Sequence, residues 1–281
     1  MSVIIAVVVG ALATRFVVVA GRDIVSARVL QRTNYRGKRV ATAGGIFAVL
    51  AVLIVEAARD VLGSLGVGDE PGNLVRALVM FACIGFGLVG FIDDILGSPD
   101  ESGFRGHLRA LADGRLTTGV CKIAGGAAVA LVLVGAGSSI IDGKRVILDA
   151  ALVALAANFV NLCDRAPGRA LKVSFVAWIV FAIYARDDVV GVAIAPVIGA
   201  FLGLFGDDLH ERLMLGDSGA YVLGGVLGLA VVLDTGTTAR TSVLVVLIVL
   251  TALAEFVSYS KIIDRVPPLR VIDQAGRRKA A

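Results

Sequence analysis

The chain has 281 residues, of which 57% are hydrophobic, and its mean hydropathy is +0.89. A soluble domain is roughly 45–50% apolar, so this composition excludes an ordinary soluble fold and predicts an integral membrane protein. The net charge of +4 is explained by basic loops at a membrane surface and gives no argument for nucleic-acid binding.

Nine apolar segments approach the length of about 20 residues that a membrane-spanning helix needs. They lie near residues 2–20, 41–58, 73–92, 118–137, 146–163, 171–186, 188–206, 218–234 and 240–258. The first segment has no basic residues before its apolar core, unlike a signal peptide, so it is expected to stay as a membrane helix. The sequence therefore predicts an all-α, polytopic integral membrane protein with about nine transmembrane helices.

The basic residues predict how these helices are oriented, because basic loops stay in the cytoplasm. Most of the 27 Lys and Arg lie in the connections after the odd-numbered segments and in the tail. The other side is flanked only by Arg59, Arg76, Lys144, Arg145, Arg186 and Arg240. We expect the N-terminus outside and the C-terminus in the cytoplasm. Residues 1–260 then form a single transmembrane helical domain with polar loops on its cytoplasmic face, and 261–281 a basic cytoplasmic tail.

Polar residues of interest begin at the start of the second segment, in the order Lys38-Arg39-Val40-Ala41-Thr42-Ala43-Gly44-Gly45. Paired glycines allow close backbone approach, and a lysine nearby could hold an anion there. Helix-to-helix packing of small residues is the simpler explanation for the glycines alone.

The third segment ends in Gly90-Phe91-Ile92-Asp93-Asp94. Acids on a membrane segment are costly and usually face a cavity or the interface. Paired carboxylates suit Mg²⁺, which typically takes one or two of them plus phosphates, although a solvated helix end would also explain them. Lys122, about one turn into the fourth segment, could reach a phosphate or extend to the interface.

Two further groups of polar residues lie on the same predicted side. Asn158, Asn161 and Asp164 are spaced by three, so they follow one side of the fifth segment. Such amides need polar partners, which could be a ligand or another helix. Asp207 and Asp208 precede Leu215-Gly216-Asp217-Ser218-Gly219, a tight turn into the eighth segment, where an acid could cap the helix.

Taken in order, these motifs resemble the polyprenyl-phosphate sugar-1-phosphate transferases, glycosyltransferase family 4. The family includes phospho-N-acetylmuramoyl-pentapeptide transferase and the undecaprenyl-phosphate N-acetylglucosamine-1-phosphate transferases. The resemblance extends from about residue 30 to 230 and is carried by Thr42 to Gly45, Gly90 to Asp94, Lys122, Asn158 to Asp164 and Leu215 to Gly219.

The resemblance implies an enzyme that transfers a sugar-1-phosphate from a UDP-sugar to a polyprenyl phosphate, with Mg²⁺, and releases UMP. Asp217 would be the metal ligand, and Asp93 and Asp94 would lie beside it, one of them acting as general base or nucleophile. Substrate-binding residues would be Lys38, Lys122, Asn158, Asn161 and Asp164. The enzyme would work at the cytoplasmic face of the plasma membrane in cell-envelope polymer synthesis, among membrane lipids; a homodimer is left open.

The chain departs from the family pattern in four respects. Asp207 stands ten residues before Asp217, where the family usually has asparagine. Arg165 follows Asp164 where the family usually has glycine, and only His107 and His210 exist in place of a histidine-rich loop. A tenth span is common in the family. These departures keep an alternative open, a catalytically reduced member that binds a polyprenyl lipid or an envelope-assembly partner. A transporter ranks third, since no inverted repeat is visible.

Overall fold

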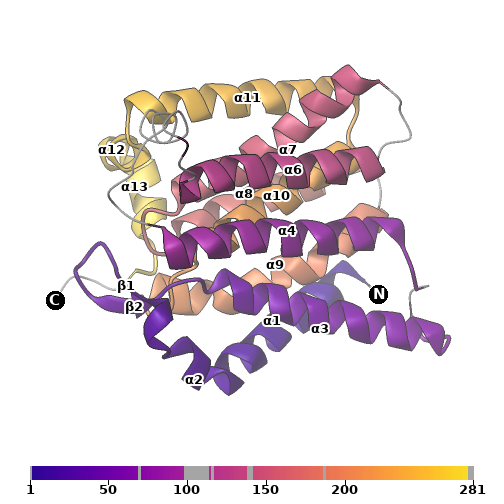
Figure 1. Cartoon of the computed structure of the whole chain (residues 1–281), viewed down its shortest axis with the longest axis horizontal. Helices are drawn as coiled ribbons and strands as arrows, with labels where there is room; N and C mark the ends of the chain where they lie inside the picture. The colour runs from indigo at the N-terminus through magenta and orange to yellow at the C-terminus, as the bar shows by residue number, and fades with distance from the viewer. Residues whose placement is uncertain are drawn as a thin grey trace.

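The computed structural model describes residues 2–68, 71–97, 114, 117–137, 142–185 and 188–277. It is a bundle of helices that lie side by side along the long axis of the molecule (Figure 1). The long helices are α1 (Val3–Ala20), α3 (Gly45–Ser64), α4 (Leu74–Leu96), α6 (Thr118–Gly137), α7 (Gly143–Cys163), α8 (Arg169–Tyr184), α9 (Asp188–Leu209), α10 (Gly216–Asp234) and α11 (Thr237–Phe256).

Shorter elements gather at one end of the bundle, at the left of Figure 1. They are α2 (Arg22–Val25), the 3-10 helix η1 (Arg28–Leu30), α12 (Tyr259–Arg265), α13 (Pro267–Gln274), and the strands β1 (Gln31–Thr33) and β2 (Arg39–Ala41). β1 and β2 pair antiparallel, with Arg32 opposite Val40. We call this end of the bundle the hairpin end, and the opposite one the far end.

The long helices coincide with the nine apolar segments, which confirms the all-α polytopic character. Seven of the described helices are long and apolar enough to cross a membrane: Val3–Ala20, Leu74–Leu96, Thr118–Gly137, Gly143–Cys163, Val189–Leu209, Gly216–Asp234 and Thr237–Phe256. α8 has only 16 residues, and α3 carries Glu56, Arg59 and Asp60. The count of nine spans therefore stays a prediction, as does the direction in which the chain crosses the membrane.

α10 is the central helix, and nearly all of its residues are buried. Neighbouring helices can pack closely around it because several of its positions are glycines, which have no side chain. A Cβ added to Gly224 would collide with the backbone of Ala156 on α7, and one added to Gly225 would collide with the ring of Phe86 on α4. Close backbone approach through small residues is the usual way in which membrane helices pack. The N-terminus of α10, with Asp217, is thereby placed among the ends of several helices.

α1 packs on α9 in the same way. A Cβ on Gly10 would collide with the carbonyl oxygen of Pro196, and one on Gly199 with that of Val7. The two helices therefore approach closely along their length, which brings the end of α1 near Arg15 beside the end of α9 near Asp207.

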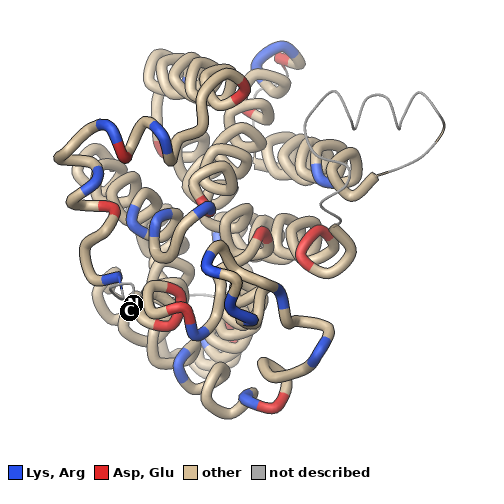
Figure 2. Tube along the Cα trace, turned by 90° about the vertical axis from the view of Figure 1, so that its left-hand side faces the viewer, with Lys and Arg blue, Asp and Glu red and all other residues tan. Residues whose placement is uncertain are grey.

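Charge is distributed differently at the two ends. Figure 2 looks onto the hairpin end and shows Lys and Arg on many of its loops and helix ends. At the far end the acids form ion pairs with the bases. Glu56 Oε1 lies 2.5 Å from Arg59 Nη1, and Glu56 Oε2 lies 2.7 Å from Arg76 Nε. Asp149 similarly pairs with Arg145 and Arg240. This asymmetry supports a hairpin end in the cytoplasm.

Candidate active site

Three helix ends bring two carboxylates onto one ammonium group. Asp93 lies in the last turn of α4, Lys122 in the second turn of α6, and Asp217 in the first turn of α10. Lys122 Nζ lies 2.9 Å from Asp93 Oδ2 and 2.5 Å from Asp217 Oδ2. The same Nζ lies 5.2 Å from the centroid of the Tyr221 ring, a cation–π contact. A single positive charge is therefore held between two acids from different helices.

Asp94, although adjacent to Asp93, has different partners. Its Oδ1 accepts a hydrogen bond from the backbone N–H of Asp217 at 3.0 Å, and its Oδ2 accepts one from that of Ser218 at 2.9 Å. The Thr42 hydroxyl also donates to Oδ1, at 3.2 Å. The first N–H groups of a helix have no partner within the helix, and a carboxylate is favoured beside them. Asp94 thus caps α10 from a different helix.

Glycines permit this arrangement. Gly216 has φ +74°, and a Cβ there would lie 2.7 Å from Asp94 Oδ2 and 2.8 Å from the backbone nitrogen of Ala43. A Cβ on Gly90 would collide with the carbonyl of Asp217, and one on Gly45 with the backbone of Gly219. The absence of side chains at these positions lets α3, α4 and α10 meet around Asp217.

α7 contributes an amide and a further acid. Asn161 Nδ2 donates to Asp217 Oδ1 at 2.6 Å. Asp164, which follows α7, is partly buried and lines the same cleft as Asp94 and Asp217. Burial, together with the negative charges of Asp208, Asp217 and Asp94, raises the pKa of Asp164 well above its usual value. Other acids therefore surround this carboxyl. A positively charged or hydrogen-bonding ligand would reduce the electrostatic repulsion between them.

A cleft of about 420 Å³ opens beside these groups. It is lined by Thr33, Asn34, Tyr35, Thr42, Asp94, Asp164, Arg165, Ala166, Pro167, Asp208, Glu211, Met214, Gly216 and Asp217. Its polar walls come from the β-hairpin, from the loop after α7 and from the turn before α10. The loops after α7 and before α10 are fixed by one buried acid, because Asp208 accepts from the N–H of Gly168 at 2.7 Å and of Leu215 at 3.0 Å.

Of the five residues expected to bind substrate, only Asp164 lines this cleft. Lys122 and Asn161 instead contact Asp217, which does line it. Asn158 is partly buried, one turn before Asn161 on α7. Lys38 lies beyond Glu211, to whose carbonyl oxygen its Nζ donates at 3.4 Å, and lines a neighbouring pocket. Asp207 also lies in that pocket, paired with Arg15 and with Arg212. The roles in substrate binding expected for all five residues stay predictions, those of Lys38 and Asn158 included.

The residues present fit a hard divalent cation. The carboxylates of Asp93 and Asp217 already share one cationic group, and both supply the oxygen ligands that Mg²⁺ prefers. No group of three or more His, Cys, Asp or Glu side chains placed for a metal exists among the described residues. A metal here would therefore take few protein ligands and leave positions for phosphate oxygens, as Mg²⁺ commonly does.

Residues 76–235 match the model of glycosyl transferase family 4. This chain belongs to that family. The match begins with α4 and ends with α10, so it includes Asp93, Asp94, Lys122, Asn161, Asp164 and Asp217. Membership confirms the resemblance that the order of motifs indicated.

Curated relatives in glycosyl transferase family 4 are similar over a comparable region. The chain is 29% identical over 206 residues to a phospho-N-acetylmuramoyl-pentapeptide-transferase of Shouchella clausii, covering 68% of this chain and 60% of that protein. It is 30% identical over 197 residues to the protein of that name from Halalkalibacterium halodurans, covering 66% of this chain and 58% of the relative. The chain thus spans about three fifths of the length of these relatives.

Three residues of the site received no role from the sequence. Thr42 and Asp208 were visible in the motifs, but only the fold shows their contacts. Thr42 donates to Asp94, which caps α10, and Asp208 accepts from Leu215 in the turn before α10. Arg165 appeared as a departure from the family pattern, and the structure places it on the cleft wall. Its position directly after Asp164 was the signal, because a base there can offset a neighbouring acid.

Proposed function

We propose that the protein transfers a sugar-1-phosphate from a UDP-sugar to a polyprenyl phosphate and releases UMP, in the synthesis of a cell-envelope polymer. The observation that supports this most is the convergence of Asp93, Lys122 and Asp217 beside a polar cleft at the end of a membrane bundle. Joining two anionic substrates requires fixed positive charge and placed acids. Family membership supports the same reaction class.

In this proposal Asp93 rather than Asp94 is the catalytic acid–base group. Both oxygens of Asp94 already accept hydrogen bonds from backbone N–H groups, so a role as base would break the cap of α10. Asp93 is instead held by the side chain of Lys122. Asp93 would accept the proton of the lipid phosphate, whose oxygen then attacks the β-phosphorus of the UDP-sugar. The bond from that phosphorus to the bridging oxygen breaks, and UMP leaves.

The remaining groups bind and orient the substrates. Lys122 would move its charge from the two acids to the diphosphate, and Arg165 would meet phosphate at the cleft wall. Asn161 and Asp164 offer hydrogen-bonding groups to the uracil ring. Asp217 would hold Mg²⁺, which when bound offsets the charge on the diphosphate.

The test is transfer of label by the purified protein with Mg²⁺, polyprenyl phosphate and a panel of radiolabelled UDP-sugars, scored in the lipid extract. Asp217→Asn keeps the size of the side chain but removes its charge. Activity should fall by at least about a hundredfold, because losing a metal's charge stabilisation costs several kcal/mol of barrier. Folded yield in detergent should change little.

Asp264→Asn is the matched control, since this exposed acid on α12 lies outside the cleft and should leave transfer unchanged. Equal activity of Asp217→Asn and wild type would refute the metal role. A wild-type protein that is inert on every donor, yet retains polyprenyl phosphate, would favour the catalytically reduced lipid-binding member.

A further inference from the structure

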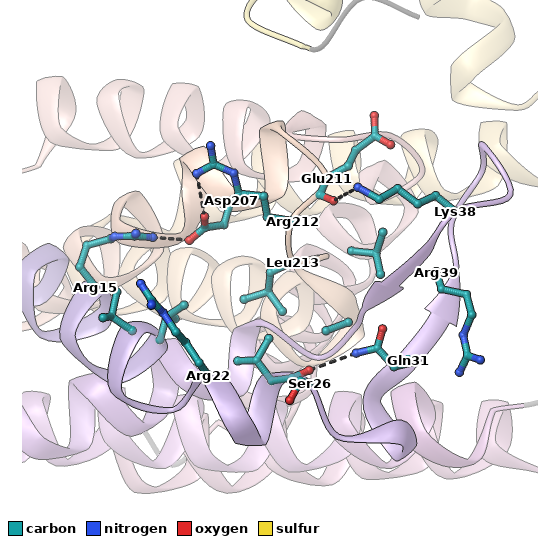
Figure 3. Close-up of a pocket in the computed structure, with 15 residues that line it drawn as sticks. Arg15, Arg22, Ser26, Gln31, Lys38, Arg39, Asp207, Glu211, Arg212 and Leu213 are labelled. Carbon is teal, nitrogen blue, oxygen red and sulfur yellow. Dashed lines mark hydrogen bonds and ion pairs between the residues drawn. The ribbon is translucent and has the colours of Figure 1, made fainter. Parts of the chain in front are cut away.

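A second pocket, of about 540 Å³, lies at the hairpin end between the ends of α1 and α9 (Figure 3). It adjoins the cleft of the candidate site, because Glu211 lines both. Its walls come from the last turn of α1, from α2, from β2 and from the turn after α9. α1 and α9 both contain candidate membrane spans that end here, so the pocket opens where such spans would meet water.

The pocket carries an excess of positive charge. Five basic residues line it: Arg15, Arg22, Lys38, Arg39 and Arg212. The two acids in the lining, Asp207 and Glu211, already form ion pairs. Asp207 pairs with Arg15 and Arg212, and the Glu211 carboxylate pairs with Arg36 and accepts from Asn34.

Arg22 and Arg39 are exposed, and no described acid forms an ion pair with either of them. In Figure 3 the Arg22 side chain points toward Arg15 and Asp207, whereas Arg39 lies on β2 beyond Gln31. Their charges are therefore available to an anion that enters from the water or from the membrane surface.

The rest of the lining is apolar and continues onto the outer face of α1. Val18, Val19, Val25, Val40 and Leu213 line the pocket. On α1, Val8 (49% exposed), Leu12 (65%) and Val19 (44%) follow the same side of the helix as Arg15, with spacings of three and four residues. An apolar track thus leads along a candidate span into a basic pocket.

We propose that this pocket binds the phosphate-diester headgroup of an anionic glycerophospholipid, whose acyl chains lie along the exposed face of α1. Basic pockets between membrane helices at the surface are suited to such headgroups. The apolar track favours a lipid over free phosphate, which would gain nothing from it. The inference does not depend on the proposed transfer reaction, because neither Arg22 nor Arg39 lines the cleft.

The test is native mass spectrometry of the purified full chain in neutral detergent, titrated with phosphatidylglycerol or phosphatidylcholine of the same acyl chains. Wild type should bind one phosphatidylglycerol about tenfold or more tightly than phosphatidylcholine, since each basic residue near a surface contributes to anionic-lipid binding. Arg22→Gln with Arg39→Gln should remove that preference, and Arg22→Gln alone should reduce it.

Arg28→Gln with Arg270→Gln is the matched control. These two exposed residues lie on η1 and α13, outside the pocket, and their loss changes the net charge equally. The control should keep the preference of the wild type, with denaturation temperatures alike in all variants. The proposal is overturned if the pocket variant binds phosphatidylglycerol as the wild type does, or if the control loses the preference as well. It is also overturned if excess inorganic phosphate displaces the lipid, because the pocket would then bind the soluble anion.

Discussion

Asp93 and Asp94 are neighbours in sequence, yet they contact different parts of the site. The helix turns by about 100° between adjacent residues, so Asp93 faces α6 and Lys122, while Asp94 faces the N-terminus of α10. One acid keeps a side chain as its partner, and the other is fixed by backbone N–H groups. The position of Asp217 therefore depends on Asp94.

A substitution at Gly216 would test how closely Asp94 and α10 must approach each other. Gly216→Ala places a Cβ 2.7 Å from the Asp94 carboxylate in a left-handed backbone conformation. Strain at positive φ and overpacking together should cost about 2–4 kcal/mol, seen as a lower denaturation temperature, and transfer activity should fall further. Gly135→Ala on α6, where a Cβ would meet nothing within 4 Å, is the control. Wild-type stability and activity in Gly216→Ala would contradict the cap.

The residue types of the site were predictable from the sequence, but their pairings were not. Costly acids and amides at the ends of apolar segments indicated Asp93, Asn161 and Asp217, because each is expensive without a partner. Which acid meets Lys122 and which caps α10 depends on helix rotation and on glycine contacts between helices. Such contacts between distant segments leave no local pattern.

At the scale of elements, the C-terminal helices are tied to the start of α8. Arg169 donates through Nε and Nη2 to Asp273 at 2.8 and 3.0 Å, and Nη1 donates to Ser260 at 2.8 Å. Lys172 donates to carbonyl oxygens at the end of α13. The segment 261–277, expected only as a basic tail, thus continues into helices that contact the bundle, although the division at residue 260 stays a prediction. Pro267 begins α13, as its ring permits only in the first turn.

This connection should be sensitive to acid. Burial alone would raise the pKa of Asp273, but the hydrogen bond from Arg169 and the charges of Arg169, Arg277 and Lys172 hold it below its usual value. A carboxyl with a lowered pKa contributes stability above its unfolded pKa, about 3.9, and loses that contribution as the pH falls through the folded pKa.

The measurement is the denaturation temperature in detergent as a function of pH. Wild type should exceed Asp273→Asn at neutral pH, and the difference should shrink as the pH drops below about 4. Asp264→Asn, an exposed acid on α12, should show little difference from wild type throughout. A difference between wild type and Asp273→Asn that is constant with pH would assign the effect to packing rather than to charge.

For the molecule as a whole, the two ends differ in how their charges are used. Glu56 and Asp149 each neutralise arginines at the far end. At the hairpin end, five basic residues line the second pocket, and Figure 2 shows Lys and Arg on many of the loops there. Composition and apolar run lengths predicted the helices because burial in a bilayer requires such runs. The small β-hairpin left no comparable signal, since its strands have three residues each.

The orientation of the bundle follows from this asymmetry and can be measured. We expect the hairpin end in the cytoplasm, where basic residues are retained. Single cysteines at Arg28 or Arg270, in a chain whose native cysteines are replaced, should react with an impermeant thiol reagent only after cells are permeabilised. A cysteine at Leu65, 73% exposed just after α3 at the far end, should react in intact cells and serves as the control. Labelling of Arg28→Cys in intact cells would place the cleft outside, away from the nucleotide-sugar pool that a transferase of this class needs, and would overturn the proposed function together with the orientation.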